Sequence, residues 1–428
     1  MTRRRSVATP DLGASARDRA PASLWERSRT VGAALGLAVT GLVGLQIGSS
    51  PPAQAASGGR HAPITVGIIC SCTGGLASSN AGGPPVYQAW ARDVNSHGGI
   101  NGHKVDVIVK DDALNVGTAL AEATSLIKQD HVVALVDASA VDESFATYAQ
   151  QQHVPIVGGD AASIEFFTNP NFFPAGETED GFLATYAYAA KKVGAKNIGN
   201  FYCAESASCQ AAIPILKQAA TSLGLKVGYV AEISASSPNY TAQCLAAKDA
   251  GISGLLIGEG VSTDLVVAAD CTQQGYYPYY LEGDGAVAKS FTTAPGFDRH
   301  FIGFEQDIPF FTHSNSGIEV MDKTLARYAD SVLRSPNYGE QEVEMWVSGL
   351  LLEAAVKAGK AGEHGPVTTD QLYKGLYALH GTTLGGMAPP LSYKAGHTHG
   401  IECWFWIGIK NHRFVTPYST SPVCPSSS

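Results

Sequence analysis

The chain has 428 residues, 45% of them hydrophobic, and its 29 basic and 38 acidic residues give a formal charge of −9 at pH 7. This acidic balance argues against a nucleic-acid-binding protein, which needs a basic surface. The length is enough for two compact lobes with their own cores. Beyond the N-terminal segment no apolar run is long enough to span a bilayer, since even 404–409 has only six residues.

The N-terminal segment has the features of a secretory signal peptide. Residues 1–30 contain seven Arg and no Lys, residues 31–48 are uncharged, and Ala53-Gln54-Ala55 matches an A-x-A cleavage site. We therefore expect residues 1–55 to be a Sec- or Tat-type signal peptide, followed by a short linker over 56–63. A retained N-terminal anchor is the alternative.

Cleavage before Ala56 would change both the charge and the location of the protein. It removes seven basic and three acidic residues and leaves 22 and 35, a charge of −13. No Cys near the cleavage site could carry a lipid. The exported chain is therefore expected to be secreted, or extracytoplasmic and associated with the cell envelope.

The first predicted elements are a strand, a Gly-rich loop, a helix and a second strand. Residues 66–69 (VGII) form the short apolar run of a buried parallel strand, and 73–75 (TGG) break it. Over 81–95 the large apolar side chains recur every four residues, which places them on one face of a helix. A Gly pair then stops the helix before the strand that ends at 111–112. No GxGxxG occurs in the first loop, so a dinucleotide site is not predicted.

The same alternation of strands and helices continues along the chain. Further strands are predicted at 132–136, 155–157, 197–202, 226–230, 254–257 and 279–281. Further helices are predicted at 118–129, 144–151, 178–193, 210–223, 239–250, 263–274, 319–333 and 341–358. With right-handed crossovers this order predicts an α/β protein with two doubly wound parallel sheets.

Two segments carry a resemblance to a known family. They are the run from Ile64 to Asp112, with its turn His97-Gly98-Gly99-Ile100-Asn101-Gly102, and the Gly, Pro and aromatic series of 384–397 (LGGMAPPLSYKAGH). Together they resemble the branched-chain amino acid (Leu/Ile/Val) binding proteins, the substrate-binding proteins of ABC importers. The resemblance extends from about Ile64 to Phe414.

The resemblance implies a type I periplasmic-binding-protein-like fold, in which two doubly wound parallel-sheet lobes are joined by three hinge crossovers. The hinges would lie near 174–178, 305–311 and 381–390. The implied domain boundaries are 64–176 with 308–382 for lobe 1, 177–307 with 383–418 for lobe 2, and 419–428 for a C-terminal tail.

The resemblance also implies a ligand site in the loops at the carboxyl ends of the strands, where open α/β sheets bind ligands. In lobe 1 the family holds a ligand carboxylate with backbone N–H groups and small hydroxyls, and in lobe 2 an acid, matched by Asp284, pairs with the α-ammonium. The candidate ligand-binding residues are Ser79, Ser139, Asp160, Ala161, Ser206, Glu259, Asp284 and Trp346.

Each of these candidates also has a structural interpretation. Asp284 precedes a Gly and could be an exposed turn residue, Ser79 and Ser139 could be satisfied loop hydroxyls, and Trp346 could lie in a helix interface. Asp160 departs from the family because an acid there would repel a carboxylate, unless the alignment of that loop slips by one residue. The Cys-bounded loop 205–208 also departs, because the family shows an aromatic residue and a Gly there. Both departures put an ordinary Leu, Ile or Val ligand in doubt.

All eight cysteines lie in the exported part, and an even number of cysteines outside the cell favours disulfides. The pairs we expect first are Cys203–Cys209, Cys244–Cys271 and Cys403–Cys424. Cys70 and Cys72 then pair by elimination in a small strained ring, or are free or labile. Zinc at Cys70 and Cys72, or a metal at His397 and His399 with His380 or His412, is the alternative, and no metal is predicted.

No sequence motif supports catalysis. The chain has no GxSxG, no HExxH and no phosphate loop, and no cofactor is predicted. The resemblance instead implies an extracytoplasmic solute-binding protein of an ABC importer. Such a protein is expected to be a monomer that closes on a small polar ligand such as an amino acid and docks on a permease. The alternatives are an extracellular sensing protein for an amide or aromatic acid, and an enzyme of unknown chemistry.

Overall fold

The computed structural model describes residues 61–283 and 285–425. The predicted signal peptide over 1–55 and the candidate residue Asp284 lie outside the described residues. Within the described part of the chain, no helix has both the length and the apolar character to cross a membrane.

The first sheet is parallel and has five strands in the order β2-β1-β3-β4-β5. The strands are β1 (Ile64–Cys70), β2 (Val105–Asp111), β3 (Ala134–Ala138), β4 (Ile156–Gly159) and β5 (Phe172–Phe173). The helices between them are α1 (Ala77–Asn80), α2 (Gly83–Ser96), α3 (Val116–Lys128), α4 (Glu143–Gln151) and α5 (Glu165–Thr168). The predicted helix over 81–95 is α2, which begins two residues later than predicted, and its Pro pair lies in the first turn, which suits Pro better than a helix interior.

The second sheet has seven strands in the order β14-β13-β10-β9-β8-β6-β7. They are β6 (Asn197–Cys203), β7 (Lys226–Ile233), β8 (Gly254–Gly258), β9 (Tyr279–Glu282), β10 (Phe301–Glu305), β13 (Phe405–Ile409) and β14 (Phe414–Val415). The helices with this sheet are α6 (Glu179–Lys192), α7 (Ala207–Ser222), α8 (Thr241–Asp249), α9 (Val261–Gln273) and the short 3-10 helix η1 (Lys289–Thr293).

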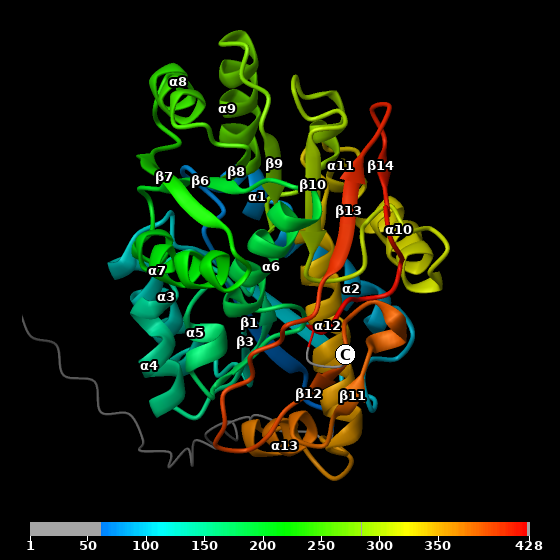
Figure 1. Ribbon diagram of the computed structural model, residues 1–428. Coiled ribbons are helices and arrows are strands. Elements are labelled where there is room, and N and C mark those ends of the chain that lie inside the picture. The colour runs from blue at the N-terminus through cyan, green and yellow to red at the C-terminus, as the bar shows by residue number, and fades with distance from the viewer. Residues whose placement is uncertain (1–60, 284, 426–428) are drawn as a thin grey trace, which may run out of the picture. The chain divides into compact units, whose positions relative to one another are not determined.

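This second sheet carries an antiparallel edge in addition to the expected parallel strands. β13 runs antiparallel to β10 and to β14, while β6 to β10 are parallel. Figure 1 shows β13, in red near the C-terminal end of the chain, beside β10. The apolar run of 404–409 is therefore a buried strand that returns to the sheet, and such antiparallel edges are common on parallel sheets.

After β10 the chain leaves the second sheet and returns to the part of the molecule that contains the first sheet, before it comes back to form β13. This stretch comprises α10 (Ser316–Tyr328), α11 (Asp330–Leu333), α12 (Glu340–Ala358), α13 (Thr369–Leu376), the strands β11 (His380–Thr382) and β12 (Leu391–Ser392), and the 3-10 turn η2 (Leu384–Gly386). The predicted helix over 319–333 breaks at Ala329, whose φ of −147° is not helical. Helix α12 packs on α2 so closely that a Cβ on Gly349 would lie 2.4 Å from the Trp90 ring.

We call the five-stranded sheet with α1 to α5 and α10 to α13 lobe 1, and the seven-stranded sheet with α6 to α9 lobe 2. Three segments connect the lobes and lie side by side. Thr178 N–H donates to the Ile401 carbonyl at 3.0 Å, and Tyr393 O–H donates to the Pro174 carbonyl at 2.6 Å. These bonds join the first connection to the third.

We propose that the third connection lies later in the chain than the predicted 381–390. Residues 383–390 form the loop between β11 and β12, which pair as an antiparallel ribbon in a two-stranded sheet of their own. The chain passes to β13 over 393–404. We propose that this segment, with 174–178 and 306–315, forms the hinge, and that the lobe boundaries are otherwise those expected from the sequence.

Four disulfides are present: Cys70–Cys72, Cys203–Cys209, Cys244–Cys271 and Cys403–Cys424. The last three are the pairs expected from the sequence. Cys70 and Cys72, which the sequence left as paired, free or labile, are bonded to each other in this structure. Cys203–Cys209 closes the loop after β6, and Cys244–Cys271 joins α8 to α9.

Candidate functional site

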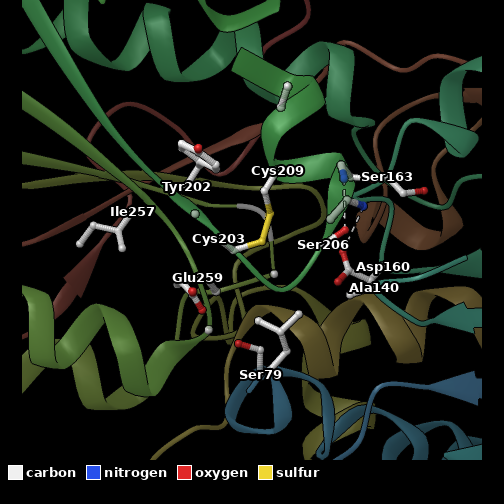
Figure 2. A pocket seen from close by; sticks show the side chains of 18 of the residues that line it. Ser79, Ala140, Asp160, Ser163, Tyr202, Cys203, Ser206, Cys209, Ile257 and Glu259 are labelled. Atoms are coloured by element: carbon white, nitrogen blue, oxygen red, sulfur yellow. Dashed lines mark hydrogen bonds between the residues drawn. A yellow bond between two sulfur atoms is a disulfide. The ribbon is translucent and has the colours of Figure 1, made fainter. Parts of the chain in front are cut away.

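A cavity of about 130 Å³ lies where the carboxyl ends of the strands of both lobes meet. Loops after β1, β3 and β4 line it from lobe 1, and the ends of β6, β8 and β9 line it from lobe 2. Figure 2 shows Ser79 and Asp160 around the same space as Glu259 and the Cys203–Cys209 disulfide. Five predicted ligand-binding residues line this cavity: Ser79, Ser139, Asp160, Ser206 and Glu259.

Two other predicted residues lie away from the cavity. Ala161 is fully buried in the apolar core of lobe 1. Trp346, on α12, is 2% exposed and packs in the core between the helices of lobe 1, which was the structural interpretation of this residue. The structure therefore does not bring either side chain to the candidate site.

The lobes are joined beside the cavity by two serine hydroxyls that accept hydrogen bonds from the first turn of α9. Val261 N–H donates to Ser79 Oγ at 3.2 Å, and Ser262 N–H donates to Ser78 Oγ at 3.1 Å. The first N–H groups of a helix have no partner within it, so these hydroxyls satisfy two of them. Contact between the lobes is therefore coupled to groups that line the cavity. Ser78 was not predicted, although it stands next to Ser79 in the first loop.

The lobe 1 wall is held by internal hydrogen bonds centred on Asp112. This buried carboxylate accepts from Ser71 Oγ at 2.8 Å and from Ser139 Oγ at 2.5 Å. The N–H of Ser139 donates to Asp137 Oδ1 at 2.9 Å, and the N–H of Ala140 donates to Ser71 Oγ at 3.0 Å. The hydroxyl of Ser139 is thus a donor already used within the protein.

A pair of carboxyl groups lies on the lobe 2 side. Glu259, after β8, is 6% exposed, and burial together with the neighbouring Glu205 carboxyl raises its pKa to about 9. Partial burial acts to raise the pKa of Glu205, but hydrogen bonds from Glu259, Ser234 Oγ and Ala235 N–H outweigh it and lower that pKa. Near neutral pH one proton is therefore held between the two, on Glu259. Glu205 was not among the predicted site residues. It belongs to loop 205–208, whose departure from the family was the feature of the sequence that could have identified it.

Asp160 faces the cavity from lobe 1. Burial raises the pKa of its carboxyl to about 7. It lies close to lobe 2, because a Cβ on Gly285 would be 3.4 and 3.5 Å from its two carboxylate oxygens. Gly285, with φ of +72°, donates its N–H to Glu340 Oε2 at 3.1 Å. Gly285 therefore meets both Asp160 and the first residue of α12.

Part of the cavity wall is apolar. Phe182, Leu183 and Leu256, all buried, line its lobe 2 side. Among the described lining residues there is no Lys, Arg or His. Such a wall can receive an apolar ligand body while the acids and hydroxyls orient a polar group.

A metal site has no support in the described residues. No group of three or more His, Cys, Asp or Glu side chains there is arranged to hold a metal ion. Cys70 and Cys72 are joined to each other. His399 is buried and stacks on Phe173 with the ring centroids 4.8 Å apart.

Two lobes that meet over a cavity at the ends of their sheets define a ligand-binding protein of the type I periplasmic-binding fold. Residues 63–413 match the model of the periplasmic binding protein family, and the chain belongs to that family. The resemblance seen in the sequence is thereby confirmed. Membership implies an extracytoplasmic location and the binding of small molecules. No curated protein matches the sequence.

Several solved structures share the fold. A branched-chain amino acid ABC transporter protein from Thermus thermophilus with bound valine has a TM-score of 0.74 at 15% identity, covering 86% of this chain and 97% of that one. A fatty acid ABC transporter substrate-binding protein from Thermomonospora curvata has a TM-score of 0.70 at 15% identity, covering 85% and 91%. A solute-binding protein from R. palustris in complex with benzoate has a TM-score of 0.67 at 15% identity, covering 84% and 97%.

Proposed function

We propose that this protein is the extracytoplasmic solute-binding component of an ABC importer, and that its lobes close on a small polar ligand, an amino acid or a related compound. The observation that supports this most is the cavity itself, because residues from both lobes line it and two hydrogen bonds join the lobes at its edge. A ligand that touches both lobes stabilises their contact, since it binds the closed form more tightly than the open one.

The closed form would then dock on a permease, and the protein would act as a monomer. The structures that share the fold include proteins whose ligands are valine and benzoate, so the fold accommodates several ligand classes. Ser79, Ser139, Asp160, Ser206 and Glu259 are our candidates for ligand contacts, and Asp284 remains the candidate partner of a ligand amine.

A thermal-shift screen tests ligand binding directly. Amino acids, amines, amides, small aromatic acids and polyols are added to the exported protein, and we expect at least one compound to raise the melting temperature. A ligand at 100 times its dissociation constant adds about 2.7 kcal/mol of stability, which moves the midpoint by several degrees. No shift with any compound would contradict the proposal.

The chain offers a matched pair of control variants. Ser208 lines the cavity and is partly exposed, whereas its neighbour Ala207 is exposed and does not line it. Ser208→Trp should abolish the shift because the indole fills the cavity, and Ala207→Trp should retain it. Uptake of the identified compound should be slower in cells that lack the protein, which separates transport from sensing.

Export is tested on the protein recovered outside the cell. N-terminal sequencing should find Ala56 as the first residue or close to it. Recovery of the protein with residues 31–48 still attached would show that the N-terminal segment is an anchor.

A further inference from the structure

The oxygen atoms that face the cavity outnumber the donors available to them. Glu259 is 6% exposed and shares one proton with Glu205, and the backbone N–H groups of Ala235 and Gly260 near its carboxyl oxygens do not reach hydrogen-bond geometry. Asp160 accepts only from Ala162 N–H, at 3.2 Å on Oδ1, which leaves Oδ2 without a donor among these residues. The Oδ1 atom of the buried Asn200 also has no partner there. Buried acceptors without donors are costly, so these three lining residues call for a donor.

The donors of lobe 1 that could hold an anion are engaged elsewhere. The hydroxyl and the N–H of Ser139 donate to Asp112 and Asp137, and the N–H of Ala140 donates to Ser71. The hydroxyl of Ser163, which also lines the cavity, donates to Asp142. A carboxylate at this wall would have to break these bonds.

The ionisable side chains around the cavity are all acids. Asp160 and Glu259 line it, Glu205 lies beside Glu259, and Glu340 lies beside the Gly285 turn. No Lys, Arg or His among the described lining residues balances them. A ligand carboxylate would therefore be buried here without a cationic partner, whereas a ligand cation would favour the ionised form of these acids and pair with it.

The apolar part of the cavity wall and the cavity volume indicate the size and polarity of the ligand body. Phe182, Leu183 and Leu256 offer a surface without polar atoms on their side chains. The volume of about 130 Å³ is close to that of cavities that hold a single benzene molecule, about 150 Å³. The ligand body is thus small and apolar.

From these contacts we infer that the cavity takes an organic cation, a protonated amine on a small apolar body, in preference to a ligand that carries a carboxylate. Asp160 and Glu259, which Figure 2 shows on different sides of the cavity, receive the N–H groups of this cation, and the lobe 2 side chains receive its apolar body. The inference rests on the proposed function and names the ligand class of the same site.

Four probes that share a branched apolar body test the inference. Isoamylamine is a cation, leucine is a zwitterion, 4-methylpentanoate is an anion and 4-methylpentanamide is neutral. Calorimetric titration of the exported protein with each should show the tightest binding for isoamylamine, at least tenfold tighter than for leucine. A parallel series of phenethylamine, phenylalanine and 3-phenylpropanoate tests an aromatic body.

Variants connect the preference to the two acids. Asp160→Asn and Glu259→Gln should each weaken amine binding roughly 30-fold or more, because each removes one charged partner from a buried contact. Their melting temperatures without ligand should stay the same or rise, since the amides no longer place an ionisable group in the cavity. Glu353→Gln, at a surface salt bridge with Lys357 on α12, is the matched control and should bind like the wild type.

The outcomes separate this inference from the proposed function. Tighter binding of leucine, of either carboxylate or of the amide would overturn the inference and leave a solute-binding protein. Amine binding that both acid variants retain would also overturn it. A complete lack of binding to all seven probes would count against the inference and the proposed function together.

Discussion

Gly260 offers the sharpest test of lobe closure, because an added methyl group would meet the other lobe. It is the residue before α9, and its φ of −78° and ψ of 158° suit any amino acid. A Cβ on it would lie 3.1 Å from Ser78 Oγ and 3.4 Å from Ser79 Oγ. The change Gly260→Ala is therefore tolerated by the backbone of lobe 2 and crowds only the contact between the lobes.

The magnitude follows from the two hydrogen bonds at this contact. Each is worth about 0.5 to 1.5 kcal/mol net, so the loss of both costs roughly 1 to 3 kcal/mol in the closed form. At 1.4 kcal/mol per factor of ten, ligand affinity should fall roughly 5- to 150-fold. Stability should change little, because the gain of about 0.4 to 1 kcal/mol from Gly→Ala is offset by the poorer helix cap.

Calorimetric titration with the best ligand from the screen measures the affinity, and small-angle scattering at saturating ligand reports whether the lobes close. Gly365→Ala is the matched control, because a Cβ there meets no atom within 4 Å. For Gly260→Ala we expect lower affinity, a more open ligand-bound form and a melting temperature within a few degrees of the wild type. Gly365→Ala should keep the affinity of the wild type. Equal affinity in Gly260→Ala and the wild type would refute the idea that this contact controls closure.

Three further predictions concern pH, the disulfides and Asp284. Burial raises the pKa of Glu342 to about 8 from the ordinary 4.5, so the folded state holds this proton more tightly than the unfolded state. The stability it contributes is complete below about pH 4.5 and is lost as the pH rises through about 8, by up to about 1.4 kcal/mol per pH unit. The melting temperature should therefore fall from pH 5 to 8, and less steeply in Glu342→Gln; an unchanged slope would contradict this. Replacing Cys244 and Cys271 by Ala together should lower the free energy of unfolding by about 3 kcal/mol in urea, since their disulfide closes a loop of 27 residues; free thiols at both positions in the oxidised protein would rule the bond out. Asp284→Asn should weaken the binding of any amine-bearing ligand without moving the melting temperature by more than a few degrees, and unchanged affinity by calorimetry would make it a turn residue.

Much of the fold could be predicted because local patterns determine it. Apolar runs such as 66–69, and the Gly residues that stop the helices, mark strands and helices with errors of a few residues at their ends. The pairing of β11 with β12 and the antiparallel pairing of β13 with β10 could not be predicted in this way. Both depend on which distant strand accepts the chain, and short strands carry little periodicity of their own.

The same distinction between local pattern and tertiary contact applies to the candidate site. The sequence by itself placed Ser79, Asp160 and Glu259 in loops that follow strands, because parallel strands end at one edge of their sheet. Only the tertiary structure decided that Trp346 packs between helices, that Glu205 lies beside Glu259, and that the donors of lobe 1 are already engaged. The reason is physical: a residue's position along a strand follows from the chain, whereas its partners and the pKa of its carboxyl depend on groups that folding brings from the other lobe.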